Sequence, residues 1–176
     1  MWGGVLLHDL GMRFDTPTIN LTVDSFPQFV SEYTTLYQTE TKPYTLDVEN
    51  QPSYPVLRIG DNIIKAIHYK SVDEFNEKWN KRFDRFMSSD AEIFIIACDA
   101  QVKTDKDKKE FLKLPYRKVC FTNKHYDEKE FIYIPGYDNL ESVGDLTKYC
   151  DLLGHRVFEK YFDCVSWLNS GEYKQW

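Results

Sequence analysis

The sequence predicts an α/β fold, a three-layer sandwich in which helices cover a mixed, mainly parallel central sheet. Helical and strand patterns alternate along all 176 residues, as they do in proteins of this class. The unbroken apolar run at residues 93–98 is typical of a central strand that is buried on both faces. Two strand patterns on either side of Gly60-Asp61 indicate a hairpin, and a hairpin makes the sheet mixed rather than purely parallel.

Length and charge narrow the class of protein. A chain of 176 residues suits a single α/β domain spanning residues 1–176, with enough side chains for a sizeable core. The 28 acidic and 22 basic residues give a net charge of −6, which argues against nucleic-acid binding. Neither a leader nor an apolar run of transmembrane length is recognisable, so we expect a cytoplasmic protein without direct membrane insertion. A place at the inner face of the membrane would come through a partner.

The first part of the chain alternates short helical and strand patterns. Asp24-Ser25 can cap a helix, and Pro27 in its first turn loses no helical hydrogen bond. The elements expected before residue 70 are a helix at residues 5–12, a strand at 17–22, a helix from Asp24-Ser25 onward, a loop at 38–53 and strands at 54–59 and 62–69.

The helix that follows is the most strongly patterned segment. Ser71 and Glu74 fit the capping box S-x-x-E at its start. At about 100° per residue, one stripe of this helix is apolar and predicts its buried face. The residues of that stripe are Val72, Phe75, Trp79, Phe83 and Phe86. Three cations fall along one edge of the stripe, namely Lys78, Arg82 and Arg85.

The second part of the chain continues the alternation. Thr104 can cap a helix whose first turn holds two aspartates. The elements expected after residue 90 are a central strand at residues 93–98, a helix from Thr104 to about residue 112, strands at 118–122 and 131–134, and a tail helix at 154–169.

Two residues at predicted strand ends could carry acid–base chemistry. His68 has a side chain that titrates near neutral pH, although a histidine on an apolar strand face is more often a core residue. Asp99 directly follows the buried run, and ligands of open α/β sheets bind at the carboxyl ends of strands. Most such aspartates make turns instead. If both strands lie parallel in one sheet, His68 and Asp99 border one pocket.

Lys78 and Arg82 are the candidate anion-binding residues. Arginine offers a planar fork for a phosphate or diphosphate, and the alternative is a solvated helix edge paired with acids such as Glu74. Lys78 is nearest to the helix start and best placed to reach the pocket, Arg82 needs its long side chain, and Arg85 is expected to be structural. The 4 histidines and 4 cysteines lack metal-ligand spacing, so we expect no metal site.

Three stretches carry a resemblance to known proteins. They are His68-Tyr69 with Lys78-Trp79, Arg82 and Arg85; Thr16-Pro17-Thr18-Ile19-Asn20-Leu21; and the tail from Gly144-Asp145-Leu146 through Trp167-Leu168-Asn169. Together they resemble a bacterial family of unknown function that is linked with exopolysaccharide biosynthesis. Members of that family usually begin with an extra strand that leads into a pair of glycines. This sequence starts at Met1-Trp2-Gly3-Gly4, so we expect that strand to be missing here.

The resemblance implies a cell-envelope pathway. We therefore expect a transferase-like protein of exopolysaccharide or capsule synthesis that acts on an activated sugar or glycan intermediate. Its catalytic residues would be His68 and Asp99, and its substrate-binding residues would be Lys78, Arg82, Tyr69 and Asn20. The expected ligand is a nucleotide sugar or glycan, and the expected partner is a membrane-associated polysaccharide-synthesis protein. No cofactor follows from the sequence.

Two other functions compete with this expectation. A non-catalytic accessory module could bind a glycan or a partner in the same pathway, and the short chain favours it. An acyl or acetyl transferase could use the same cations to hold a phosphorylated cofactor. Whether the chain is an enzyme is left open by these residues.

Overall fold

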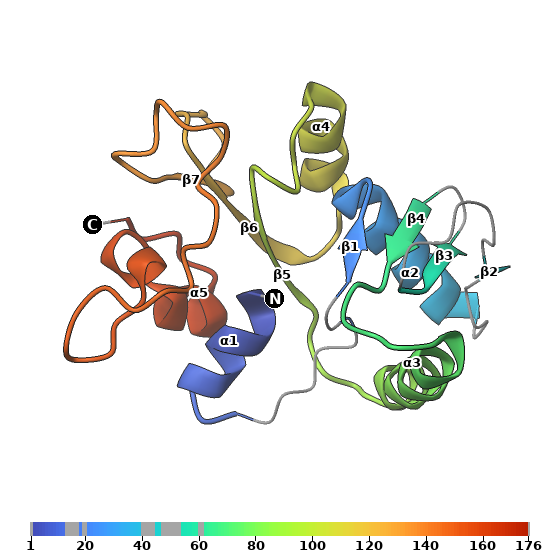
Figure 1. The fold of residues 1–176 in the computed structure, drawn as a ribbon. Coiled ribbons are helices and arrows are strands. Elements are labelled where there is room, and N and C mark those ends of the chain that lie inside the picture. The colour runs from blue at the N-terminus through green and yellow to red at the C-terminus, as the bar shows by residue number, and fades with distance from the viewer. Residues whose placement is uncertain are drawn as a thin grey trace. The chain divides into compact units, whose positions relative to one another are not determined.

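The computed structural model of the protein describes residues 2–12, 18, 21–39, 45–46, 54–59 and 62–175. The chain divides into two compact units, Gly3–Ala91 and Glu92–Trp176, and each is described by itself (Figure 1). The predicted mixture of helices and strands is confirmed. The strands form two small sheets, one antiparallel and one parallel, so the predicted three-layer sandwich about one sheet is not confirmed. No helix within these described ranges is both long and apolar enough to cross a membrane.

In its described residues, the first unit combines three helices with the antiparallel sheet. The predicted hairpin is confirmed, because Ile59 lies opposite Asn62 in an antiparallel pair. Half of the strand predicted at 17–22 lies outside the described residues, and of the rest only Thr22 is in a strand. The helices are α1 (Trp2–Asp9), α2 (Phe26–Thr39) and α3 (Val72–Met87), and the strands in sheet order are β1 (Thr22–Val23), β4 (Asn62–Lys65), β3 (Val56–Ile59) and β2 (Thr45–Leu46).

Aromatic rings fill the core of the first unit. The predicted apolar stripe of α3 is confirmed, since Phe75, Trp79 and Phe83 are all almost completely buried. Tyr33 of α2 meets the rings of Trp79 and Phe83 edge-on, with centroids 5.7 and 5.5 Å away. At the start of α3 the Ser71 hydroxyl accepts the Glu74 N–H at 3.1 Å, as the capping pattern predicts.

The second unit is built on the parallel sheet, in the order β5 (Phe94–Cys98), β6 (Arg117–Thr122) and β7 (Phe131–Tyr133). The prediction that residues 93–98 form the central strand was wrong, because β6 pairs on both sides and β5 only with β6 among the described strands. Every β6 residue after Arg117 is buried. An apolar run therefore predicted burial correctly but not the position within the sheet.

Helices cover both faces of this parallel sheet. Phe111 of α4 (Asp105–Lys113) contacts the ring of Phe131 on one face. Phe131 pairs with Cys120, so the next residue, Phe121, points to the opposite face. There the Phe121 ring contacts the rings of Phe158 and Phe162, which lie in the C-terminal part of the chain.

The tail is not the single helix predicted at 154–169. A 3-10 turn, η1 (Val157–Lys160), is followed by a separate helix, α5 (Cys164–Ser170). The helix restarts because Asp163 caps it, accepting the Ser166 N–H at 2.9 Å. The restart rotates the helical phase, so Val165 is 53% exposed although the continuous pattern placed it inward.

Candidate functional site

The best-defined group of predicted site residues lies at the start of α3, in the first unit. After β4 ends at Lys65, the Tyr69 N–H donates to the Ala66 carbonyl at 3.0 Å and closes a turn. This turn directs Tyr69 inward, where its ring is 6% exposed and lies 5.1 Å from the Phe75 ring. Local backbone geometry and core packing thus fix Tyr69 without help from a ligand.

Two predicted cations lie beside this tyrosine. Glu74, Lys78 and Arg82 follow one another at four-residue spacing, which places them along one face of α3. The Arg82 Nη1 donates to the Tyr69 hydroxyl at 2.5 Å, and the Lys78 Nζ lies 5.7 Å from the centre of the Tyr69 ring. Lys78 also forms an ion pair with Glu74 at 2.6 Å. We call these four residues, Tyr69, Glu74, Lys78 and Arg82, the Tyr69 cluster.

The Tyr69 cluster carries more positive than negative charge. The hydrogen bond from Lys78 lowers the pKa of the Glu74 carboxyl, and the Lys70 N–H lowers it further. Glu74 is therefore ionised at neutral pH and balances the charge of Lys78. Arg82 donates to a neutral phenol instead, and among the residues that the structure describes no carboxylate pairs with it. Its remaining N–H donors suit a phosphate or carboxylate from outside the chain.

His68 does not lie on the strand face on which the sequence placed it. The strand ends three residues earlier, and His68 is exposed in the turn that leads to Tyr69. The longer strand was predicted because Ile67 continued the alternating apolar pattern, yet Ile67 is itself 44% exposed. His68 is therefore a solvent-accessible neighbour of the Tyr69 cluster in sequence, and not a core residue.

Asp99 lies in the second unit, directly after β5. One of its carboxylate oxygens accepts the Asn123 N–H at 2.9 Å, and the other accepts the Val143 N–H at 3.0 Å. Both oxygens thus hold backbone segments together at the carboxyl end of the parallel sheet. Because β4 and β5 belong to different sheets, the crossover argument that joined His68 to Asp99 no longer holds. A pocket shared by the two residues stays a prediction.

The remaining candidates do not add to the site. Asn20 lies outside the described residues. Arg85 lies in the last turn of α3, where it is half-buried. In the described ranges of the chain, no three His, Cys, Asp or Glu side chains are arranged to hold a metal ion.

Sequence reasoning missed Asn123, the partner of Asp99. This residue is 5% exposed, and its side-chain amide donates to the Leu140 carbonyl at 2.5 Å. Asn123 directly follows β6 just as Asp99 directly follows β5, so its position after an apolar strand pattern could have identified it. The side chains of Asp99 and Asn123 thus tie the loop after β7 to the ends of β5 and β6.

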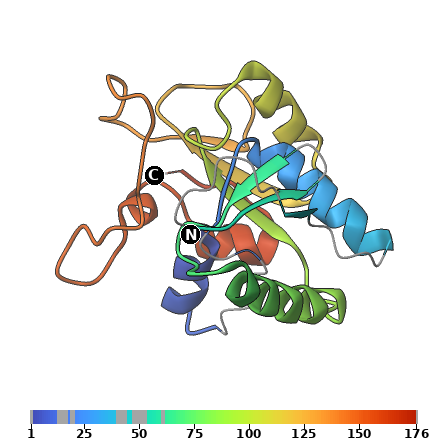
Figure 2. The same ribbon diagram turned by 45° about the vertical axis from the view of Figure 1, so that its right-hand side comes forward.

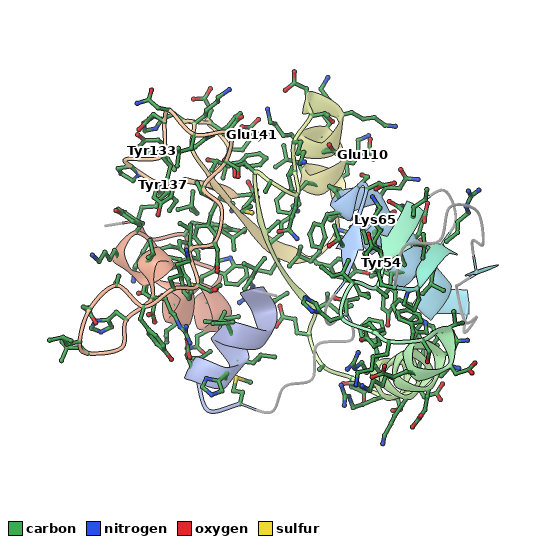
Figure 3. The ribbon with its side chains drawn as sticks, viewed as in Figure 1. Tyr54, Lys65, Glu110, Tyr133, Tyr137 and Glu141 are labelled. Atoms are coloured by element: carbon green, nitrogen blue, oxygen red, sulfur yellow. The ribbon has the colours of Figure 1, made fainter. Side chains whose placement is uncertain are left out.

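A second missed group lies at the end of β7. The Tyr133 ring stacks on His125 with centroids 3.7 Å apart, and its hydroxyl donates to Asp138 at 2.6 Å. Figure 3 shows Tyr133 together with Tyr137 and Glu141 on one side of the second unit. The hydrogen bond from Tyr133 lowers the pKa of the Asp138 carboxyl. No spacing in the sequence predicts this group, because His125 and Asp138 come from the loops before and after β7.

Comparison with known proteins places the chain among relatives. A family model described as a domain of unknown function, DUF1919, matches residues 1–169. The chain belongs to the DUF1919 family. An uncharacterized protein of Haemophilus influenzae is 35% identical over 170 residues, which cover 95% of this chain and 80% of that protein. The resemblance to a bacterial family of unknown function is confirmed to this extent, and the DUF1919 match includes the whole Tyr69 cluster.

Proposed function

We propose that this DUF1919 protein is transferase-like and binds an activated sugar or glycan intermediate of exopolysaccharide or capsule synthesis through its phosphate groups. The observation that carries the proposal is the Tyr69 cluster, where Lys78 and Arg82 lie against one tyrosine. A nucleotide sugar offers a diphosphate that two neighbouring cations can bind.

Each member of the cluster has a distinct role in this proposal. Arg82 binds the diphosphate with the N–H donors that it does not give to Tyr69, and Lys78 adds the N–H donors that it does not give to Glu74. The Tyr69 hydroxyl holds the guanidinium in place. His68, exposed in the adjoining turn, takes the proton of the acceptor hydroxyl while Arg82 stabilises the negative charge that builds on the leaving diphosphate.

A non-catalytic accessory module is the second candidate function. Asp99 favours it, because both oxygens of this predicted catalytic carboxylate accept backbone N–H groups. Such a module would bind a glycan or a membrane-associated partner of the same pathway without turning it over. The acyl-transferase alternative uses the same cations, so the identity of the ligand decides between the two enzymatic functions.

A thermal-shift panel of nucleotide sugars, acyl-CoA compounds and oligosaccharides tests the proposal. A ligand at about 100 times its Kd should stabilise the protein by about 2.7 kcal/mol. We expect this shift with a nucleotide sugar, and we expect Arg82→Gln and Lys78→Gln to reduce it. Lys81→Gln is the matched control. Lys81 is exposed on the same helix, and its substitution removes one positive charge outside the cluster.

The pattern of the panel separates the candidate functions. A shift with acyl-CoA compounds alone would favour acyl transfer, and a shift with oligosaccharides alone would favour the accessory module. A shift that Lys81→Gln reduces as much as Arg82→Gln would mean that general charge and not the Tyr69 cluster attracts the ligand. No shift with any phosphorylated compound would contradict the proposal.

A further inference from the structure

A loop of the second unit exposes two leucines side by side. Leu152 and Leu153 are 106% and 84% exposed, and the loop that carries them, residues 149–156, projects from its unit in two views (Figure 1 and Figure 2). We call this segment the leucine loop. Single exposed apolar residues are ordinary, but two adjacent ones at the apex of an ordered loop form a small apolar surface.

The leucine loop is held in shape by its own hydrogen bonds. Tyr149 and Arg156 form an antiparallel bridge at its base, and the Cys150 N–H donates to the His155 carbonyl at 2.9 Å. The Arg156 guanidinium lies 3.9 Å from the centre of the Tyr149 ring and donates to the Thr147 carbonyl at 2.6 Å. The two leucines are therefore presented by a folded arch.

Several polar groups of the tip are bonded within the loop. One carboxylate oxygen of Asp151 accepts the N–H groups of Leu153 and His155, both at 3.0 Å. The Gly154 N–H donates to the Asp151 carbonyl at 3.4 Å, and the His155 ring lies 2.7 Å from the other carboxylate oxygen. These bonds lower the cost of bringing the two leucines against an apolar medium while the Asp151 carboxylate stays at the boundary with water.

The base of the leucine loop carries cations and an exposed aromatic side chain. Lys148 precedes the loop and Arg156 ends it, and the carboxylates Asp145 and Glu159 lie beside the same base. Tyr149 is 61% exposed and stacks on the Arg156 guanidinium. Apolar side chains at the apex with aromatic and cationic ones below match the layers of a membrane surface.

We propose that the leucine loop contacts the surface of a phospholipid bilayer. Leu152 and Leu153 enter the boundary of the acyl chains, and Tyr149 and the cations meet the phosphate headgroups. The contact is shallow and involves no membrane-spanning segment. A protein partner or second copy fits less well, because two leucine side chains supply only a small part of the roughly 1,200 Å² that stable protein interfaces bury.

Co-sedimentation of the full chain with vesicles tests this inference. The vesicles are phosphatidylethanolamine mixed with phosphatidylglycerol, and the double variant Leu152→Ser/Leu153→Ser is compared with the parent protein. We expect the double variant to bind the vesicles at least about tenfold more weakly than the parent protein. Leu140→Ser is the matched control, because Leu140 is 56% exposed elsewhere in the same unit, and it should bind like the parent. Circular dichroism checks that each variant is folded.

Several results would overturn the inference. They are a parent protein that binds no vesicles, a double variant that binds equally well, and a Leu140→Ser variant that loses as much binding. Sedimentation velocity on the same proteins tests whether a second copy of the chain, and not a membrane, covers the two leucines. If the parent protein binds no vesicles but self-associates, and the double variant does not, the leucines contact a second copy of the chain. If the parent protein neither binds vesicles nor self-associates, the leucines would be assigned to contact with a different protein.

Discussion

The two units of the chain are held together by different interactions. In the first unit, the rings of Tyr33, Phe75, Trp79 and Phe83 pack around one face of α3. In the second unit, apolar residues also cover the sheet, but charged side chains fix the loops by binding backbone groups. Asp99 is one example. The comparison teaches that ring packing decides the stability of the first unit, whereas the loops of the second unit depend on ionised groups.

Truncation of Trp79 should give the largest effect on the first unit. The side chain is 3% exposed and contacts the rings of Tyr33 and Phe75, so Trp79→Ala leaves a cavity. We expect a loss of about 3–5 kcal/mol in the free energy of unfolding, measured by urea denaturation. Lys81→Ala on the exposed side of the same helix should change it by less than about 0.5 kcal/mol. A small loss at Trp79 would refute the described core.

Replacement of Arg117 is the matching test of the second unit. Its guanidinium donates to the carbonyls of Trp167 and Leu168 at 2.8 and 2.5 Å, and so closes the end of α5. Arg117→Met keeps the length of the side chain but leaves both carbonyls without this donor. We expect a loss of about 2–3 kcal/mol in urea denaturation. Lys113→Met removes an exposed cation of the same unit and should cost far less.

The sequence predicted elements whose signal is local. The helix from Ser71 was correct in its cap and in its buried stripe, because capping and helical period act within a few residues. The two sheets were not predicted, because strand pairing depends on contacts between distant residues. The tail shows how a local rule can also mislead. Its apolar period predicted one continuous helix, but the cap at Asp163 starts a new helix inside that pattern.

The candidate site was predictable in the same local way. Tyr69, Lys78 and Arg82 meet because they lie within one turn and one helix, where sequence spacing translates directly into position. The proposed link between His68 and Asp99 rested on the order of strands in a single sheet, which local patterns do not determine. Contacts between loops, such as that of Asn123 with Leu140, leave no periodic signal at all.

Acid should affect the second unit before the first. Among the described residues, hydrogen bonds lower the pKa of one carboxyl in the first unit, Glu74, and of five in the second. Those five are Asp105, Asp138, Asp145, Asp151 and Asp163. A lowered folded pKa contributes stability that is complete above the unfolded pKa of about 4, and this stability is lost as the pH falls through the folded pKa.

Hydrogen exchange measured at decreasing pH detects this difference. We expect protection to weaken first in residues 92–175, after correction for the intrinsic exchange rate. Asp163→Asn should make the start of α5 less sensitive to acid, because asparagine caps a helix without titrating. Equal loss of protection in residues 62–91 would show that the aromatic unit depends on its carboxyl groups just as much.

Thiol labelling gives the smallest perturbation and reports only on the second unit, which holds all four cysteines. Burial raises the pKa of Cys98 to about 11 and that of Cys164 to about 12, and it also raises that of Cys120. These thiols stay protonated at about pH 8 and should resist a disulfide reagent. Cys150, which is partly exposed, should react first. Rapid labelling of Cys120 would contradict the buried position of β6.

The position of the bound ligand tests the central claim, that the Tyr69 cluster binds a phosphate-bearing sugar, most directly. Titration of the isotope-labelled chain with UDP-glucose, followed by nuclear magnetic resonance, compares the two units in one experiment. We predict that shifts concentrate in residues 66–82, around Tyr69 and Arg82, and that Arg82→Gln removes them while Lys81→Gln does not. Shifts concentrated at Asp99, Asn123 and Val143 would instead place the ligand at the carboxyl end of the parallel sheet and contradict the claim.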